Sequence, residues 1–179
     1  LSAQSGHALD RVRALIQRRN QPPEPVDVNA VAASCIDGVK GRIQHLGARF
    51  VANYEEGLPV LYGDPIELEQ ALGQLVDNAL DAMRDSPPQR RQLYLTTSHN
   101  TGGDQIVIQI EDTGPGVSQG LVQQLFEPWA PGRTGGVGLG LTIARTIVDS
   151  FQGRIRYEAG PRGGAMFRVE LPVNLEDPM

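Results

Sequence analysis

The chain lacks several features that mark large classes of protein. It has one cysteine, Cys35, so no disulfide can form within it, and the apolar pattern around Cys35 indicates a buried structural thiol in a reducing compartment. No apolar run reaches the roughly 18 residues of a membrane span, and no signal peptide is recognisable. The net charge of -5 argues against nucleic acid as a partner, because polyanions are bound by clustered Lys and Arg.

What the chain has in excess is glycine, which makes up 21 of its 179 residues and is concentrated between residues 102 and 164. A hydrophobic fraction of 40% is enough for a core, and the length allows one ordinary domain with a short addition. Because the first residue is Leu1 instead of Met, we expect the chain to be an excised piece of a longer protein.

The domain boundary is expected in the proline-rich stretch NQPPEPVD. The segment before it, residues 7–19, has apolar positions at helical spacing and needs a partner to bury them. Closely spaced prolines cannot continue that helix. We therefore expect residues 1–20 to be the end of a dimerisation helix, 21–26 a linker, 27–175 the main domain and 176–179 a tail.

Helices and strands alternate within the main domain. Asp27 and Asp64 are expected to cap helices, and Gly153 is expected to end one. Several strands are linked as hairpins, which favours an α/β (α+β) two-layer sandwich with a mixed, mainly antiparallel sheet and helices on one face. The expected helices cover 28–46, 64–85, 118–126 and 138–151, and the expected strands lie in 48–63, 93–98, 105–112, 154–160 and 165–173.

The segment IQIEDTGPGV places a carboxylate on the buried side of a strand. Isoleucines alternate along residues 106–110, and the two-residue period carries Asp112 onto the same face. A carboxylate removed from water needs hydrogen-bond donors. Asp112 either caps its own turn through the amides of Gly114 or Gly116, or it binds a ligand, and the segment alone leaves both open.

A polar stripe runs beside the apolar face of the helix expected at 64–85. It contains Gln74, Asn78, Asp81 and Asp85. An uncharged amide oxygen such as that of Asn78 suits a magnesium ion that also takes phosphate oxygens and water. The alternative is an ordinary helix border with solvated amides.

Alternating glycines at 136, 138 and 140 come directly before the last expected helix. Free amides and the helix dipole at such a start favour anions such as phosphate. A dinucleotide-binding fingerprint would need a strand before the glycines, and LFEPWAPGRT stands there instead. A mobile surface loop is the other interpretation, but it does not explain the abrupt helix start.

Read in order, these segments resemble the catalytic and ATP-binding domain of bacterial sensor histidine kinases, in the GHKL superfamily that also includes gyrase. QALGQLVDNALDAM resembles the N box, EDTGPG the G1 box, LFEPW the F box and GGVGLGL the G2 box, so the resemblance covers roughly residues 25–173. NALDAM and GGAMFRVELP are most similar to the subgroup of dicarboxylate and nitrogen sensors. The resemblance implies the Bergerat ATP-binding fold.

The resemblance also implies roles for individual residues. Asp112 would accept a hydrogen bond from the adenine amino group of ATP, and Asn78 would bind the Mg²⁺ that bridges the phosphates. Phe126 and residues 127–137 would form a lid ordered by nucleotide, and no residue of the chain is assigned as catalytic. The implied nucleotide-binding residues are Gln74, Asn78, Asp112, Gly114, Gly116, Val117, Phe126, Arg133, Gly136, Val137, Gly138, Leu139 and Gly140.

Three positions depart from the pattern of this family. Gln74 replaces the glutamate of the ATP-hydrolysing relatives and cannot serve as a general base. Asp81 stands where many kinases have Lys or Arg, so we expect no phosphate contact from it, with Arg133 as a possible substitute. Ala165 stands where a threonine often supports a water on the adenine side. We therefore expect modest nucleotide affinity.

None of the three histidines, His7, His45 and His99, matches a phosphoacceptor box. The expected function is thus to bind Mg-ATP and donate the γ-phosphoryl group to a histidine in a dimerisation domain of the same parent protein, absent from this chain. The expected partners are that domain and a cognate response regulator. We expect a homodimeric parent and a cytoplasmic location, and an inner-membrane sensor is one form that the parent can take. The alternatives are a non-catalytic nucleotide-sensing module and a GHKL-type ATPase.

Overall fold

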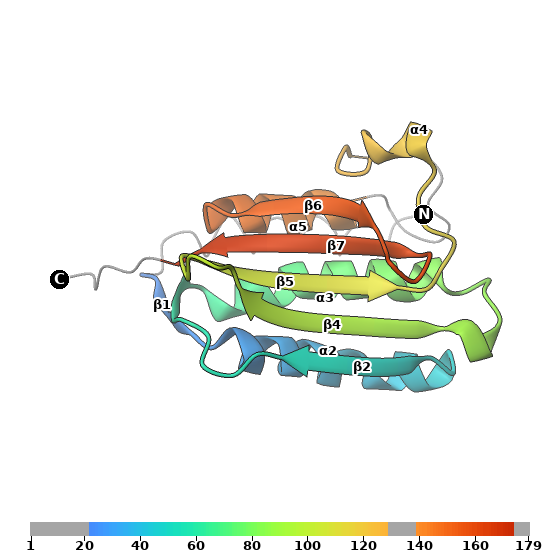
Figure 1. The fold of residues 1–179 in the computed structure, drawn as a ribbon, viewed down its shortest axis with the longest axis horizontal. Helices are drawn as coiled ribbons and strands as arrows, with labels where there is room; N and C mark the ends of the chain where they lie inside the picture. The colour runs from blue at the N-terminus through green and yellow to red at the C-terminus, as the bar shows by residue number, and fades with distance from the viewer. Residues whose placement is uncertain (1–21, 129–138, 174–179) are drawn as a thin grey trace, which may run out of the picture.

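A computed structural model describes residues 22–128 and 139–173. Within these ranges the chain forms a five-stranded sheet, a small two-stranded sheet and several helices (Figure 1). The strands are β1 (Glu24–Val26), β2 (Arg49–Tyr54), β3 (Leu61–Gly63), β4 (Gln92–His99), β5 (Gln105–Asp112), β6 (Arg154–Ala159) and β7 (Ala165–Pro172). The helices are α2 (Val28–His45), α3 (Pro65–Ala82), the 3-10 turn η1 (Pro88–Arg90), α4 (Gln119–Val122) and α5 (Gly140–Ser150).

The main sheet has the strand order β2-β4-β5-β7-β6. β2 pairs with β4 in parallel, and the other neighbouring pairs are antiparallel. The helices α2, α3 and α5 form a layer behind this sheet in Figure 1, with α3 in contact with both α2 and α5. The expected two-layer sandwich with a mixed, mainly antiparallel sheet is confirmed.

The two long helices begin as their sequences predict. Asp27 accepts a hydrogen bond from the backbone N–H of Ala30 at 3.1 Å and so caps α2. Asp64 accepts one from the N–H of Ile66 at 2.8 Å and caps α3, with Pro65 in the first turn, where its missing N–H costs nothing. Fixed starts set the register of each helix, and therefore which side chains face the sheet.

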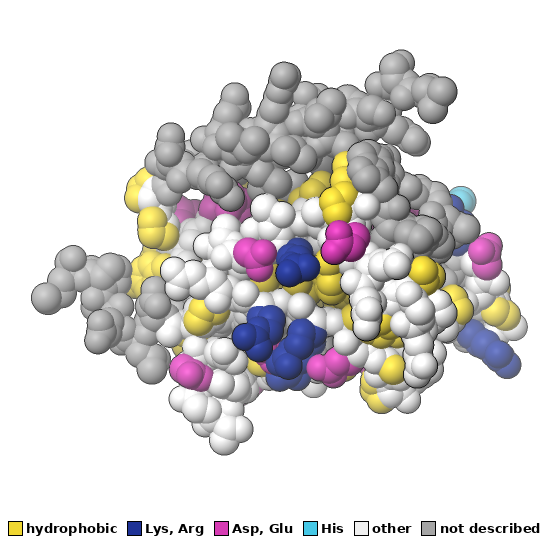
Figure 2. Space-filling model, turned by 90° about the horizontal axis from the view of Figure 1, so that it is seen from above, with side chains coloured by type: hydrophobic (Ala, Val, Ile, Leu, Met, Phe, Trp, Pro, Cys, Tyr) yellow, Lys and Arg dark blue, Asp and Glu magenta, His cyan; other side chains and the backbone are white. Residues whose placement is uncertain are grey.

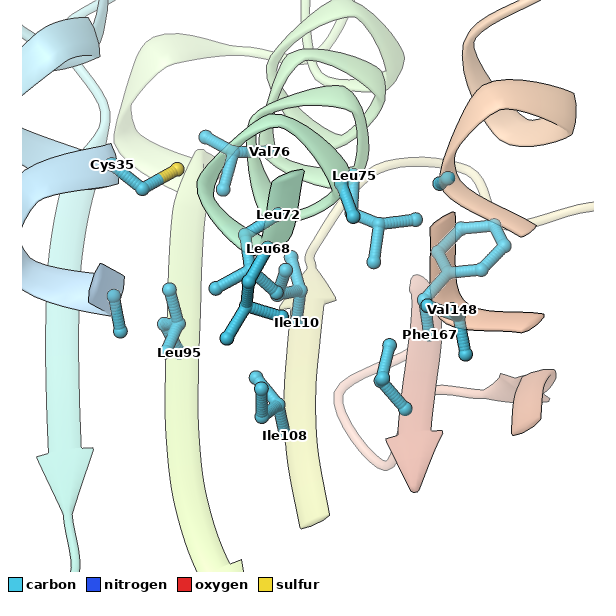
Figure 3. Close-up of a cluster of buried hydrophobic side chains, with 14 of the residues drawn as sticks. Cys35, Leu68, Leu72, Leu75, Val76, Leu95, Ile108, Ile110, Val148 and Phe167 are labelled. Carbon is cyan, nitrogen blue, oxygen red and sulfur yellow. The ribbon is translucent and has the colours of Figure 1, made fainter. Parts of the chain in front are cut away.

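The core lies between the helix layer and the sheet. Figure 3 shows side chains from α3 and α5 pointing toward β4, β5 and β7. Cys35 lies at one side of this core with 5% of its surface exposed, and burial raises the pKa of its thiol to about 12. A thiol that stays protonated is unreactive, as expected for a structural cysteine. Buried core residues include Leu68, Leu72, Leu75, Val76, Leu95, Ile108, Ile110, Val148 and Phe167.

Several local expectations need correction. The proline-rich stretch contains a strand, β1, because Val26 and its neighbours pair antiparallel with β3. The helix expected at 118–126 ends at Val122. After α5 the left-handed residue is Gln152, with φ of 57°, while Gly153 is needed for close packing, since a Cβ there would lie 2.6 Å from the carbonyl oxygen of Glu170. The helix expected at 7–19 lies outside the described residues.

The other face of the sheet carries interspersed charges. Arg156 and Arg168 both donate hydrogen bonds to Glu170, and the Arg168 bond lowers the pKa of the Glu170 carboxyl. Figure 2, seen from the side of β6 and α4, shows basic side chains gathered beside acidic ones.

No described helix has the length and apolar character that crossing a membrane requires.

Candidate functional site

The carboxyl group of Asp112 lies at the end of β5 with 1% of the residue exposed. Its Oδ1 accepts hydrogen bonds from the backbone N–H of Gly114 at 2.8 Å and from that of Ala165 at 3.4 Å. Burial raises the pKa of Asp112 from 3.8 to about 6, although the two amides lower it. The group faces the helix layer as the strand pattern predicts, and the Gly114 amide gives it the turn contact that the sequence left open.

Glycines let the backbone pass very close to this carboxyl group. A Cβ on Gly114 would lie 2.9 Å from the carbonyl oxygen of Ala82 and 3.0 Å from Oδ1 of Asp112. A Cβ on Gly164 would lie 1.9 Å from the carbonyl oxygen of Asp112. Gly116 has φ of 74°, in the left-handed region that favours glycine. Side chains at these positions would displace the backbone around Asp112.

The polar stripe of α3 divides into two parts. Gln74 and Asn78, one turn apart, are half-buried. Asp81, further along, accepts hydrogen bonds from Arg42 of α2 at 3.3 Å and from Arg84 at 2.8 Å. Asp81 is therefore engaged by arginines, whereas Gln74 and Asn78 present uncharged amides.

Gln74 lies against the start of α5. A Cβ on Gly140 would lie 2.9 Å from Oε1 of Gln74, so a larger residue would collide with that amide. Leu139 precedes the helix, and among the described residues no side chain caps its first-turn amides, which are donors that suit an acceptor. The positive end of the α5 dipole thus lies beside the amide edge of α3, an arrangement suited to an anion.

Phe126 and Val117, two further residues of the predicted site, contact aromatic side chains. The Phe126 ring is half-buried and meets the Phe167 ring edge-on at 6.2 Å between centroids. The carbonyl oxygen of Phe126 accepts a hydrogen bond from Oγ1 of Thr142 on α5 at 3.1 Å. The backbone N–H of Val117 donates to the hydroxyl oxygen of Tyr157 at 3.3 Å. Phe126 is thereby tied to α5, the helix whose start faces Gln74.

Part of the predicted site cannot be placed. Arg133, Gly136, Val137 and Gly138 lie outside the described residues, so their roles stay predictions. Within residues 22–128 and 139–173, no three His, Cys, Asp or Glu side chains gather as a metal-binding group.

The contribution of the β6–β7 turn to this site is not evident from the sequence. The family pattern marks Ala165 only as a replacement for a threonine, but its backbone N–H donates to the carboxyl of Asp112, and Gly164 packs on the Asp112 carbonyl. The glycine pair in PRGGA was the one signal of a close approach. Asp112 lies 53 residues before Ala165 in the chain, so local pattern could not identify this contact.

Comparison with known proteins agrees with this geometry. Residues 63–175 match the family described as histidine kinase-, DNA gyrase B-, and HSP90-like ATPase. The chain is 31% identical over 173 residues to the sensor histidine kinase TmoS of Ectopseudomonas mendocina, covering 97% of this chain and 18% of that protein. It is 33% identical over 174 residues to the sensory histidine kinase/phosphatase NtrB of Klebsiella oxytoca, covering 92% and 49%. It is 30% identical over 174 residues to the C4-dicarboxylate transport sensor protein DctS of Rhodobacter capsulatus, covering 96% and 26%.

Solved structures share the fold. The nucleotide-free catalytic domain of histidine kinase ThkA superposes with a TM-score of 0.75 at 22% identity, covering 85% of this chain and 96% of that one. Full-length ShkA in complex with AMPPNP superposes with a TM-score of 0.73 at 25% identity, covering 88% and 32%. The chain spans half or less of the length of the sensor proteins TmoS, DctS and NtrB. The expected family is confirmed: the chain belongs to the histidine kinase-, DNA gyrase B-, and HSP90-like ATPases.

Proposed function

We propose that this chain is the Mg-ATP-binding catalytic domain of a sensor histidine kinase, and that it donates the γ-phosphoryl group of ATP to a histidine outside this chain. The family match and the sensor kinases among its relatives support this. The observation that carries it is the Asp112 carboxyl group, which is buried, bound by backbone amides and approached by glycine backbone. The parent would act as a homodimer in the cytoplasm, with a dimerisation domain and a response regulator as partners.

Asp112 would recognise the base. At neutral pH its carboxyl is mainly ionised, since burial raises its pKa only to about 6, and a carboxylate accepts hydrogen bonds without donating them. The amino group of adenine supplies the donor that such a group needs. Guanine carries a carbonyl oxygen at that position, and two facing acceptors cost roughly 1–3 kcal/mol. We therefore expect selection of adenine nucleotides.

The amide edge of α3 fits the triphosphate. Asn78 would hold Mg²⁺ through its side-chain oxygen, a ligand type that magnesium accepts alongside phosphate oxygens and water. When bound, the ion neutralises charge between the phosphates. Gln74 lies beside Gly140 at the start of α5, where the positive end of the helix dipole would favour an anion. This part of the site therefore offers neutral amides and a positive helix end, and the two α3 carboxylates that flank Asn78 along the chain, those of Asp77 and Asp81, are bound by arginines.

The site favours transfer over hydrolysis. Gln74 is a neutral amide and cannot take a proton from an attacking water. The described residues would thus act by positioning and electrostatics, while the nucleophile comes from the acceptor histidine. A nucleotide-sensing module that does not transfer phosphate is the second candidate, favoured by the engagement of Asp81 with Arg42 and Arg84.

The first experiment is calorimetric titration of ATP, ADP and GTP, with and without Mg²⁺, into the wild-type chain and Asp112→Ala. We expect adenine nucleotides to bind the wild type and GTP to bind at least tenfold more weakly, with the difference lost in the variant. Asp37→Ala, on the exposed side of α2, is the matched control and should bind as the wild type does. Equal binding of ATP and GTP to the wild type would contradict the proposal.

The second experiment separates the candidate functions. The chain is mixed with labelled ATP and a separately made histidine-bearing helical hairpin of the parent protein. Transfer of label to the hairpin supports the kinase, and binding without transfer supports the sensing module. Steady hydrolysis without the hairpin, abolished by Gln74→Ala, would instead indicate an ATPase.

A further inference from the structure

Glu111 and Asp112 are neighbours at the end of β5 whose side chains point to opposite faces of the sheet, as successive strand residues do. Asp112 faces the helices, and Glu111 faces the outer side. Glu111 is nevertheless only 5% exposed. A buried carboxylate on an otherwise charged, open face needs an explanation, and the β6–β7 turn provides it.

The turn folds over Glu111 and satisfies both of its oxygens. The backbone N–H of Arg162 donates to Oε1 at 3.2 Å, and the guanidinium of Arg162 donates to Oε2 at 2.6 Å. Gly160 packs on the same carboxylate, since a Cβ there would lie 3.2 Å from Oε1. The Arg162 guanidinium also stacks on the ring of Tyr94, 3.9 Å from its centroid, and Tyr94 lies directly across from Glu111 in the sheet. These contacts fix a turn that is rich in glycine.

The same turn carries the backbone that touches Asp112. The N–H of Gly160 donates to the carbonyl oxygen of Gly164 at 2.8 Å, which closes the turn. Gly164 packs on the Asp112 carbonyl, and Ala165 donates to the Asp112 carboxyl at 3.4 Å. A bond of that length is near the limit of a hydrogen bond, so a shift of a few tenths of an ångström in the turn would remove it.

We infer that the Glu111–Arg162 pair is a positioning device for adenine recognition, which clamps the β6–β7 turn from the outer face so that the Ala165 amide orients the Asp112 carboxylate on the inner face. This inference rests on the proposed function. In this role Arg162, which is bound to Glu111 and stacked on Tyr94, acts through the turn and Asp112. The planar guanidinium group of Arg162 suits this role, because it can hydrogen-bond a carboxylate and stack on an aromatic ring at the same time.

Hydrogen exchange tests the mechanical part without nucleotide. In Arg162→Gln the exchange of the Ala165 amide should accelerate at least tenfold, because the turn is no longer held. Arg156→Gln is the matched control, since Arg156 is on the same hairpin, pairs with Glu170 and has a side chain exposed to 50%, against 48% for Arg162. It should leave the Ala165 amide unchanged. Equal exchange in both variants would overturn the inference whatever the protein binds.

Nucleotide affinity tests the functional part. Arg162→Gln should weaken ATP binding about fivefold, the amount expected for the loss of one hydrogen bond. The ratio of ATP affinity to GTP affinity should decrease by a similar factor. Arg162→Lys should retain only part of the wild-type ATP affinity, because lysine keeps the positive charge but lacks the planar guanidinium group. Arg156→Gln should bind ATP as the wild type does, which excludes a general effect of lost surface charge.

A double-mutant cycle shows whether Arg162 acts through Asp112. If it does, Arg162→Gln should change ATP affinity less than twofold in the Asp112→Asn background. Additive effects would overturn the inference. The proposed function fails separately, by absence of ATP binding to the wild-type chain, and in that case the exchange experiment still decides whether the pair holds the turn.

Discussion

Gly164 and Asp112 meet so closely that a Cβ on the glycine would lie 1.9 Å from the carbonyl oxygen of the aspartate. No side chain fits at this distance without movement of the backbone. The contact joins the turn before β7 to the end of β5, and the next residue, Ala165, bonds the Asp112 carboxyl. The packing of one glycine thus governs the geometry of the buried acid.

Gly164→Ala should therefore separate the turn from Asp112. We expect a loss of roughly 1–3 kcal/mol in the free energy of unfolding, as for other overpacked sites, and weaker ATP binding. Urea denaturation and calorimetry measure the two effects. Gly38→Ala in α2 is the control, since a Cβ there meets nothing within 4 Å. Wild-type stability and affinity in Gly164→Ala would contradict the expectation.

Asp112→Asn should stabilise the protein while it impairs nucleotide binding. Burial raises the folded-state pKa of Asp112 from 3.8 to about 6, so the folded protein holds its proton more tightly than the unfolded chain. The contribution of this group to stability is therefore favourable below about pH 4 and decreases as pH rises to about 6. Above that pH the variant should be more stable by about 1–3 kcal/mol, and below about pH 4 the advantage should vanish.

Denaturation of both proteins without nucleotide, from pH 3.5 to 8, measures this difference. If the difference in unfolding free energy between variant and wild type does not change with pH, the Asp112 carboxyl does not titrate near pH 6. ADP affinity gives an independent control. As pH drops below about 6 it should fall more steeply in the wild type than in the variant, because the protonated carboxyl carries an O–H donor that opposes the adenine amino group, while protonation of the ADP phosphate affects both proteins alike.

Local pattern predicted the parts of the fold that depend on near neighbours in sequence. The caps Asp27 and Asp64 are recognisable because a cap bonds an amide two or three residues away. The inward direction of Asp112 follows from the alternation of isoleucines along its own strand. In each case the cause and the consequence lie within a few residues.

The features that escaped prediction depend on distant partners. β1 forms in a proline-rich stretch because it pairs with β3, and an isolated segment shows no sign of that. The Glu111–Arg162 pair joins residues 51 positions apart. Whether the carboxyl of Glu111 is exposed or covered depends on the turn that folds over it, which the strand period cannot reveal.

Gly63→Ala should destabilise the contact between β3 and the end of α5. A Cβ on Gly63 would lie 2.1 Å from Cε1 of Phe151, a residue that is only 9% exposed. We expect a loss of about 1–2 kcal/mol in unfolding free energy. Gly41→Ala, in α2 with open space around the new Cβ, should gain up to about 1 kcal/mol from helix propensity. Equal midpoints in urea for the two variants would refute the packing argument.

Asp81→Asn tests the charge on the α3 edge that carries Asn78. The side chain of Asp81 is 31% exposed and its arginine partners more so, so loss of these ion pairs should cost at most about 1 kcal/mol of stability. A triphosphate is repelled by a carboxylate on this edge, and its removal should tighten ATP binding roughly two- to fivefold at low salt. The gain in ATP affinity should shrink in 0.5 M NaCl, where the screening length is about 4 Å.

Asp37→Asn is the control, because it makes the same charge change on the exposed side of α2 and should increase ATP affinity less. An equal gain from both variants would show that net charge, and not the position of Asp81, controls the affinity.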